Sequence, residues 1–229
     1  MEGTAAARER RRWDEVGQEF SVEYFFYCRD RASSAALRFD LAEAHWSFMD
    51  RYAEAMIARG PTLADDEVTA TGSMHIVDLP DAGAAHAFAF EEPNYRAGVY
   101  DEVLVRRWSN ALGRTMWEFT PSMVNGRRFL IIGHGKPGMT AARNTLRDEY
   151  RRFLSQGYQE RLIACGPLLS DDGTEWVGTA MLAELPDRAS AEAMLAQEPY
   201  TRAGLYDSVE IHNWRFGGRP QNDAPQADH

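Results

Sequence analysis

The chain is poor in cysteine and in long apolar runs, and each shortage excludes a class of protein. Two cysteines among 229 residues are too few for a disulfide framework, and they are not spaced as a redox or zinc pair. No stretch approaches the roughly 18 consecutive apolar residues that a membrane-spanning helix needs, and about the first 30 residues lack the pattern of a signal peptide. These absences predict a cytoplasmic protein.

Basic side chains are also in short supply. Lys and Arg total 25 against 35 Asp and Glu, so the formal net charge is −10 and the molecule as a whole repels nucleic acid and anionic lipid. The arginine cluster over 8–12 interrupts this pattern, and we interpret it as a solvated helix or a contact arm within an N-terminal extension, residues 1–20. We therefore expect a small hydrophobic or aromatic molecule as partner, and neither nucleic acid nor a membrane.

Motifs for covalent or metal chemistry are missing as well. The sequence has no G-x-S-x-G motif, and neither cysteine has a histidine near it in sequence, so no nucleophile stands in a recognisable frame. The six histidines show none of the H-x-x-x-H, H-x-H or H-E-x-x-H spacings of metal sites. We predict neither a metal nor a cofactor.

The chain does contain a repeat. Residues 58–108 lie over 164–214 without a gap, at a constant offset of 106, and 21 of the 51 positions are identical. The same offset carried backwards pairs 23–28 with 129–134. Self-similarity of this kind indicates two copies of one structural unit. The predicted organisation is listed in chain order: unit one over 21–108, a linker over 109–127, unit two over 128–214 and a loose tail over 215–229.

Each unit is predicted to be β-α-β-β-α-β, a ferredoxin-like α+β motif. In unit one we expect a strand over 22–28, a helix running to about Arg59 that Gly60-Pro61 stops, a hairpin ending near Val77, a helix over 81–90 and a last strand ending at Trp108. One face of such a sheet stays bare and apolar. We therefore expect the two sheets to pack together as a barrel-like body within one chain, with a ligand cavity between the units and with linker residues Trp117 and Phe119 held on the surface of one unit.

Several short motifs resemble those of the YCII-related domain family. They are a helix with His45, the Gly60-Pro61 turn, Glu92-Pro93 followed by Ala97-Gly98, and a final strand ending in Trp108. The likeness extends over both repeats. It implies a ferredoxin-like dimeric α+β barrel with a site centred on a histidine and an acid, and members proposed as enzymes include a dehydrochlorinase of aromatic degradation.

Carried over by the resemblance, the family's helix histidine matches His45, and its acid matches Glu92 in unit one and Glu198 in unit two. Both acids depart from the more usual aspartate, which leaves the geometry of the His–acid contact open. At the constant offset His45 corresponds to Arg151, which cannot deprotonate near neutral pH. We expect a degenerate second unit that is retained for packing or that supplies Arg151 as a cationic wall of the cavity.

A histidine oriented by a carboxylate is suited to taking and returning one proton, because its usual pKa lies near 6.5. His45 as general base, with Glu92 as its orienter or as the acid, predicts isomerisation, elimination, or cyclisation with dehydration of an aromatic or polyketide-like substrate, in secondary metabolism or aromatic degradation. The alternative is a hydrogen-bonded core histidine in a metabolite-binding or purely structural module. A monomeric pseudo-dimer and a homodimer both remain open.

Four further residues are candidates for lining the ligand cavity: His134, Glu198, His212 and Trp108. For His134, His212 and Trp108, a structural role in the core is the alternative. His75 and His86 show no partner in the sequence.

Overall fold

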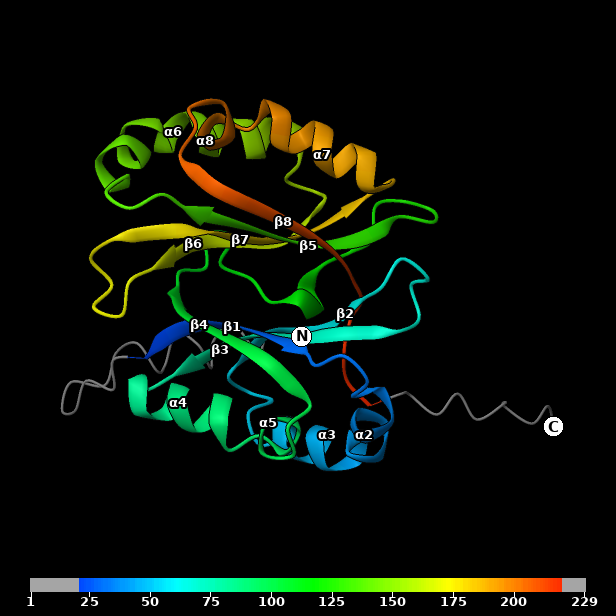
Figure 1. Ribbon diagram of the computed structural model, residues 1–229. Helices are drawn as coiled ribbons and strands as arrows, with labels where there is room; N and C mark the ends of the chain where they lie inside the picture. Colours follow the sequence, from blue (N-terminus) through cyan, green and yellow to red (C-terminus); the bar gives the residue numbers. More distant parts are fainter. Residues whose placement is uncertain (1–20, 220–229) are drawn as a thin grey trace.

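The computed structural model describes residues 21–219, and the N-terminal extension 1–20 with its arginine cluster lies outside them. Two four-stranded sheets lie face to face, and the helices of each unit cover the outer face of its own sheet (Figure 1). Unit one forms the lower half of this view and unit two the upper half. Among residues 21–219, no helix is long and apolar enough to cross a membrane.

The elements of unit one are listed in chain order: β1 (Val22–Asp30), α2 (Ala35–Asp40), α3 (Ala42–Asp50), β2 (Met56–Leu63), β3 (Ala70–Leu79), α4 (Ala82–Phe90), α5 (Pro93–Arg96) and β4 (Tyr100–Trp108). A single 3-10 turn, η1 (Met116–Glu118), lies in the linker. The elements of unit two are β5 (Arg127–Gly135), α6 (Thr140–Gly157), β6 (Leu162–Leu169), β7 (Trp176–Leu185), α7 (Arg188–Gln197), α8 (Pro199–Arg202) and β8 (Tyr206–Trp214).

All eight strands form one closed barrel in the order β1-β3-β2-β8-β5-β7-β6-β4. Neighbouring strands are antiparallel, and the units join through short pairings of β2 with β8 and of β4 with β6. Closure removes the free sheet edges that would otherwise invite further pairing. The predicted ferredoxin-like units and the intrachain α+β barrel are confirmed.

Side chains alternate between the barrel interior and the helix side of each sheet, as strand geometry requires. On β3, Met74 and Ile76 belong to the interior cluster, whereas Val77 packs with the helices. The interior is filled by apolar side chains of both sheets together with Met116 and Phe119 of the linker. The expected placement of Phe119 on the surface of one unit was therefore wrong, while Trp117 remains 54% exposed.

The first helix is shorter than its apolar spacing predicted. α3 ends at Asp50, and Gly60-Pro61 lies inside β2 instead of ending a helix. A Cβ on Gly60 would lie 2.0 Å from the carbonyl oxygen of Arg215. Glycine is needed there because the chain leaving unit two crosses β2 in close contact.

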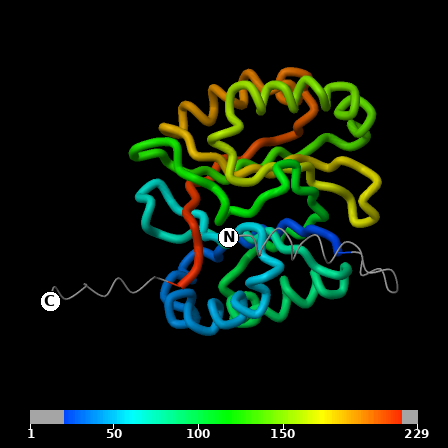
Figure 2. Tube along the Cα trace, turned by 180° about the vertical axis from the view of Figure 1, so that it is seen from behind, coloured from blue at the N-terminus to red at the C-terminus, as the bar shows by residue number. Residues whose placement is uncertain are grey.

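That crossing segment, residues 215–219, is here called the C-terminal strap. The amide of Arg215 donates to the carbonyl of Pro61 at 3.3 Å, and that of Gly217 to Arg59 at 3.0 Å. Seen from behind, the strap runs down from unit two across the side of unit one (Figure 2). The prediction of a loose tail from residue 215 was therefore wrong for 215–219, and residues 220–229 lie outside the described part of the chain.

Candidate active site

The acid-proline pair has a local role in both units, because it begins a short helix. Glu92 is the N-cap of α5, and its Oε2 accepts the amide N–H of Tyr95 at 2.8 Å, with Pro93 following at the first helical position. Glu198 caps α8 in the same way through Thr201 at 2.6 Å. A side-chain oxygen at this position satisfies a free helix amide, and proline fits the next position without losing a hydrogen bond. Both carboxylates are therefore fixed by the backbone.

Glu92 has a histidine as its second partner, whereas Oε1 of Glu198 accepts a hydrogen bond from the hydroxyl of Tyr206 at 3.5 Å. Oε1 of Glu92 lies 2.5 Å from Nδ1 of His45, on α3. The His45 side chain is 13% exposed and that of Glu92 only 3%. An ionised carboxylate can only accept hydrogen bonds, so Nδ1 carries the proton and Nε2 is left as the basic nitrogen. The longer glutamate arm thus reaches the imidazole.

His45 lines a cavity of about 170 Å³ between α2, α3, β2, β3 and the C-terminal strap. Its polar walls include Arg38, Arg59, Ser73, His75 and Asn94, and its apolar walls include Trp46, Met49, Pro61 and Phe216. The His45 cavity lies on the helix side of unit one, whereas the ligand cavity was predicted between the units. Apolar side chains pack in the barrel interior, and two other cavities, of about 320 and 380 Å³, are lined by residues of both units. Unit two nevertheless contributes one wall of the His45 cavity, through the strap.

An ordered hydrogen-bond network presents Ser73 to this cavity. Arg38 pairs with Asp30 at 2.8 Å and donates to the hydroxyl oxygen of Ser73, also at 2.8 Å. Tyr100 donates to the same Ser73 oxygen at 3.2 Å and accepts from Asn94. Because this oxygen already accepts two hydrogen bonds, the hydroxyl proton of Ser73 is free to point to a ligand. Burial raises the pKa of Asp30, and the Arg38 guanidinium opposes that shift.

His75 is the residue that sequence reasoning missed at this site. It lies on β3, is 4% exposed, and lines the same cavity with its ring centroid 5.8 Å from that of His45. Positions 45 and 75 are far apart in sequence, and only the packing of α3 on the sheet of unit one brings their side chains together. Alternation along β3 places His75 on the same face as Ser73, which is the one signal that could have indicated it.

The counterpart of His45 in unit two is Tyr150, and the predicted correspondence with Arg151 was wrong. Phe25 on β1 pairs with Ile76, whereas Leu130 on β5 pairs with Leu182, so the offset is 105 at the first strand and 106 at the later ones. Unit two therefore has one additional residue between its first two strands. When the first-strand offset of 105 is applied to α6, Tyr150 is the counterpart of His45. Arg151, the next residue, is exposed.

In unit two, aromatic side chains occupy the space that corresponds to the cavity. Tyr150 is stacked on Tyr200, and its hydroxyl contacts Cys165 at 3.5 Å. At offset 106 these two partners correspond to Asn94 and Arg59, both of which line the His45 cavity. Glu198 is fully buried, and burial raises its pKa. The space that forms the cavity in unit one is thus filled by side chains in unit two, and among the described residues no imidazole is hydrogen-bonded to Glu198.

The structure brings His134 and His212 together, but at a different place. Their Nε2 atoms each lie 2.7 Å from a different oxygen of Glu210 on β8. Arg29 of unit one also donates to Glu210, and these hydrogen bonds from His134 and His212 lower the pKa of that carboxyl. His212 lines a cavity of about 320 Å³ and His134 one of about 380 Å³. Neither lines the His45 cavity, and Glu210 was not anticipated from the sequence.

Trp108, the last of the predicted cavity residues, does not line the His45 cavity. Trp108 is 3% exposed inside the barrel, where it packs against Gly166.

Burial raises the pKa of the Cys28 thiol, and it raises the pKa of the Cys165 thiol to about 11, so neither thiol is ionised near neutral pH. Within residues 21–219, no group of three or more His, Cys, Asp or Glu side chains is placed to hold a metal ion.

A closed eight-stranded barrel made of two ferredoxin-like halves defines the class of dimeric α+β barrel proteins. The profile of the YCII-related domain matches this chain twice, over residues 22–109 and 127–215. The chain therefore belongs to the YCII-related domain family and contains two copies of its domain, which confirms the resemblance.

Comparison with solved structures identifies proteins that are similar to part of this chain and others that are similar to most of it. 5-Chloro-2-hydroxyhydroquinone dehydrochlorinase from Burkholderia phenoliruptrix AC1100, in complex with 2,5-dihydroxybenzoquinone, is 27% identical over 40% of this chain and 98% of its own, with a TM-score of 0.37. Chlorite dismutase from Candidatus Nitrospira defluvii, in complex with imidazole, has a TM-score of 0.56 at 10% identity over 91% of this chain and 95% of its own.

An anthrone oxidase-like protein has a TM-score of 0.52 at 8% identity, over 86% of this chain and 91% of its own. At such low identities the last two similarities establish the shared fold only. A comparison with curated proteins found no match.

Proposed function

We propose that this protein is a cofactor-independent enzyme that transfers a proton on a small aromatic or polyketide-like molecule held in the His45 cavity. The reaction classes that need only such a transfer are isomerisation, elimination of HX, and cyclisation with dehydration. The observation that carries the proposal is the 2.5 Å contact of His45 with a backbone-anchored Glu92 at the wall of a cavity.

The geometry supports a separate role for each member of this pair. Glu92 accepts the Nδ1 proton of His45, so Nε2 removes a proton from the ligand and the carboxylate stabilises the imidazolium that forms. The same nitrogen then returns the proton to another atom of the ligand or to its leaving group. A positioned general base of this type accelerates a reaction by about 10² to 10⁴.

The other walls of the cavity match the charge that develops when the proton leaves. The free hydroxyl proton of Ser73 and the guanidinium of Arg59 are available to an oxygen that gains negative charge, and such prearranged donors stabilise a transition state. Trp46, Met49 and Phe216 offer apolar surface to the rest of the ligand. This combination favours a compact enol, phenol or enone over a highly charged metabolite.

The test is deuterium incorporation in D₂O, followed by proton NMR, with the full chain and a panel of cyclic enones, unsaturated lactones and chlorinated hydroquinones. We expect His45→Gln to slow exchange or elimination at least a hundredfold and to retain binding. His86→Gln, on an exposed residue of α4, is the matched control and keeps the wild-type rate.

Equal rates in wild type and His45→Gln would overturn the proposal. Binding without turnover across the panel, unchanged by His45→Gln, would instead indicate a non-catalytic metabolite-binding module.

A further inference from the structure

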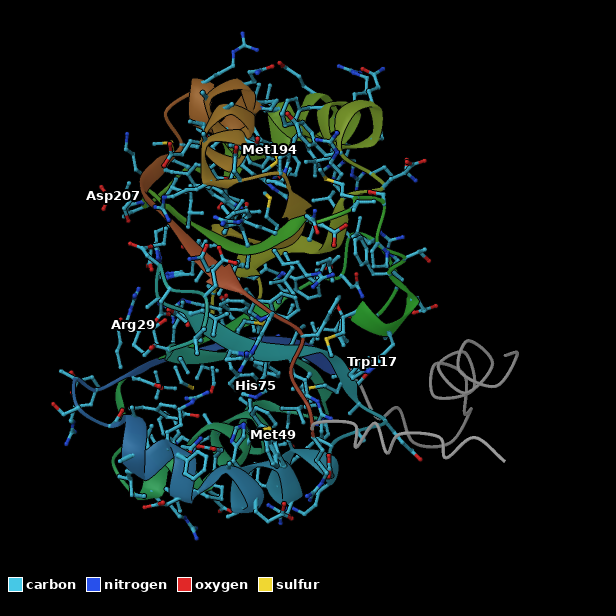
Figure 3. The ribbon with its side chains drawn as sticks, turned by 90° about the vertical axis from the view of Figure 1, so that its right-hand side faces the viewer. Arg29, Met49, His75, Trp117, Met194 and Asp207 are labelled. Carbon is cyan, nitrogen blue, oxygen red and sulfur yellow. The ribbon has the colours of Figure 1, made fainter. Side chains whose placement is uncertain are left out.

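His75 is a polar side chain in a position where a strand normally places an apolar one. It lies on β3 with its backbone paired to Phe26 on β1 and Arg59 on β2. Figure 3 shows it on the helix side of the lower sheet, above Met49 of α3. At offset 106 unit two has Met181 at this position, also buried. The fold therefore accepts an apolar residue here and does not require an imidazole.

The ring of His75 lies close to two other rings. It lies 5.8 Å from that of His45 and meets Phe88 edge-on at 5.6 Å. Neither of its nitrogens is hydrogen-bonded to any residue within 21–219, the part of the chain that the structure describes. Buried polar groups almost always have a hydrogen-bond partner, so each exception requires an explanation. Here the exception lines a cavity, which indicates a ligand as the partner.

The surroundings of His75 keep it neutral. Burial lowers its pKa well below the usual value, and the positive charges of Arg59 on β2, Arg38 on α2 and His45 on α3 when protonated lower it further. A neutral imidazole offers one N–H donor and one acceptor nitrogen. His75 therefore leaves the mobile proton to His45, which has a carboxylate to stabilise its charge.

We propose that His75 is the ligand-orienting imidazole of this cavity and forms a hydrogen bond to an oxygen of the substrate while His45 transfers the proton. The substrate class follows: a compact molecule with an acidic C–H or O–H for His45 and a second oxygen function for His75, such as a hydroxy-enone or a phenol with a ring substituent that contains oxygen. This inference deepens the proposed function and rests on it.

The probe is 4-nitrophenol, which has a phenol at one end and a nitro group at the other and is coloured only as the phenolate. Calorimetry measures its affinity, and visible absorbance below its solution pKa measures whether the bound phenol has lost its proton. We compare the full-length wild type with His75→Met, which copies unit two, and with His75→Gln, which restores a neutral N–H donor. His45→Gln and His86→Gln complete the set.

We expect His75→Met to weaken binding about tenfold, the usual effect of losing one buried hydrogen bond, and His75→Gln to recover most of it. Both variants still ionise the probe that they bind, because His45 is unchanged. A packing role predicts the opposite order, since methionine fills this position in unit two, and equal or tighter binding by His75→Met would overturn the inference. Failure of the wild type to bind the probe would also overturn it.

The two proposals fail separately. If His45→Gln ionises the bound probe as the wild type does, the role of His45 as base is wrong, whereas the order of affinities among the His75 variants still decides the role of His75.

Discussion

Tyr150 is stacked on Tyr200 in unit two, with ring centroids 4.3 Å apart and planes inclined by 5°. Tyr150 occupies the helix position that His45 has in unit one, and Tyr200 corresponds to Asn94. One pair of rings thus stands in place of both His45 and a wall of its cavity. Duplication within one chain allowed one unit to keep a cavity and the other to fill it with packed side chains.

Tyr150→Ala should therefore act on stability. Tyr150 is 8% exposed, and truncation of a buried aromatic side chain costs about 3 to 5 kcal/mol. Urea denaturation measures the change in the free energy of unfolding. Phe39→Ala, on a residue that is 81% exposed, is the control and should change it by less than about 0.5 kcal/mol. A loss below about 1 kcal/mol for Tyr150→Ala would contradict this account.

The repeat predicted the architecture because its identities lie at positions that determine chain geometry. Asp81 and Asp187 cap the helices that follow them, through Ala84 and Ser190. Gly60 and its counterpart in unit two both face the backbone of a crossing segment. Such positions tolerate few residue types, so they remain recognisable after the packed surfaces have diverged.

The site was predicted less completely, for two physical reasons. Helix–sheet packing tolerates a one-residue insertion, which moved the counterpart of His45 from Arg151 to Tyr150 without leaving a signal in the gapless alignment. The C-terminal strap forms a wall of the cavity because the chain crosses over from the other unit. The composition of residues 215–229 predicted only a loose tail. The contact of His45 with Glu92 was available from the resemblance, whereas the proximity of His45 and His75 depends on how α3 packs on β3, which the sequence does not indicate.

Glu92→Gln should separate anchoring from chemistry. The amide oxygen can still cap α5 through Tyr95, but the carboxylate that stabilises a charged His45 is lost. We expect the proton-transfer rate in the D₂O assay to fall about a hundredfold or more, with little change in the melting temperature.

Glu198→Gln in unit two is the matched control. Burial raises the pKa of Glu198, so the stability linked to this group is present below its usual pKa of 4.5 and is lost as pH rises through the raised value. Removing the charge should leave the free energy of unfolding at pH 7 equal or higher, and activity unchanged. Equal activity of Glu92→Gln and Glu198→Gln would contradict the role of Glu92.

Arg219→Ala should loosen the C-terminal strap. Arg219 donates to Glu43 at 2.5 Å, to Asp50 at 3.0 Å and to Ser47 at 3.0 Å, all on α3. Trypsin cleaves after Arg215 only when the strap opens, because backbone hydrogen bonds hold this segment against β2. Cleavage after Arg215, followed by mass spectrometry, should be several-fold faster in the variant.

Added salt should reduce this difference, since screening weakens exposed ion pairs in the wild type as well. Arg202→Ala, which removes an exposed ion pair with Glu149 at 3.8 Å in unit two, is the control and should not change the cleavage rate. A cleavage rate in Arg219→Ala equal to that of the wild type would show that the backbone contacts alone hold the strap.

Glu210 should make stability depend on pH. Hydrogen bonds from His134 and His212 lower its pKa, and Arg29 of unit one, which Figure 3 shows at the edge between the two sheets, is a further donor. A carboxyl whose pKa is lowered by folding stabilises the fold fully above its usual pKa of 4.5 and loses this contribution as pH falls through the lowered value. Urea midpoints of wild type and Glu210→Gln should therefore differ most near pH 7 and approach each other progressively as pH falls below 4.5 toward the lowered value.

Glu102→Gln is the control for this series, because Glu102 also pairs with Arg29 but is 65% exposed. Exposed pairs contribute little, so its midpoints should follow those of the wild type at every pH. A gap between wild type and Glu210→Gln that stays constant from neutral to acidic pH would mean that Glu210 acts through its shape and packing, and that its charge does not join the two units.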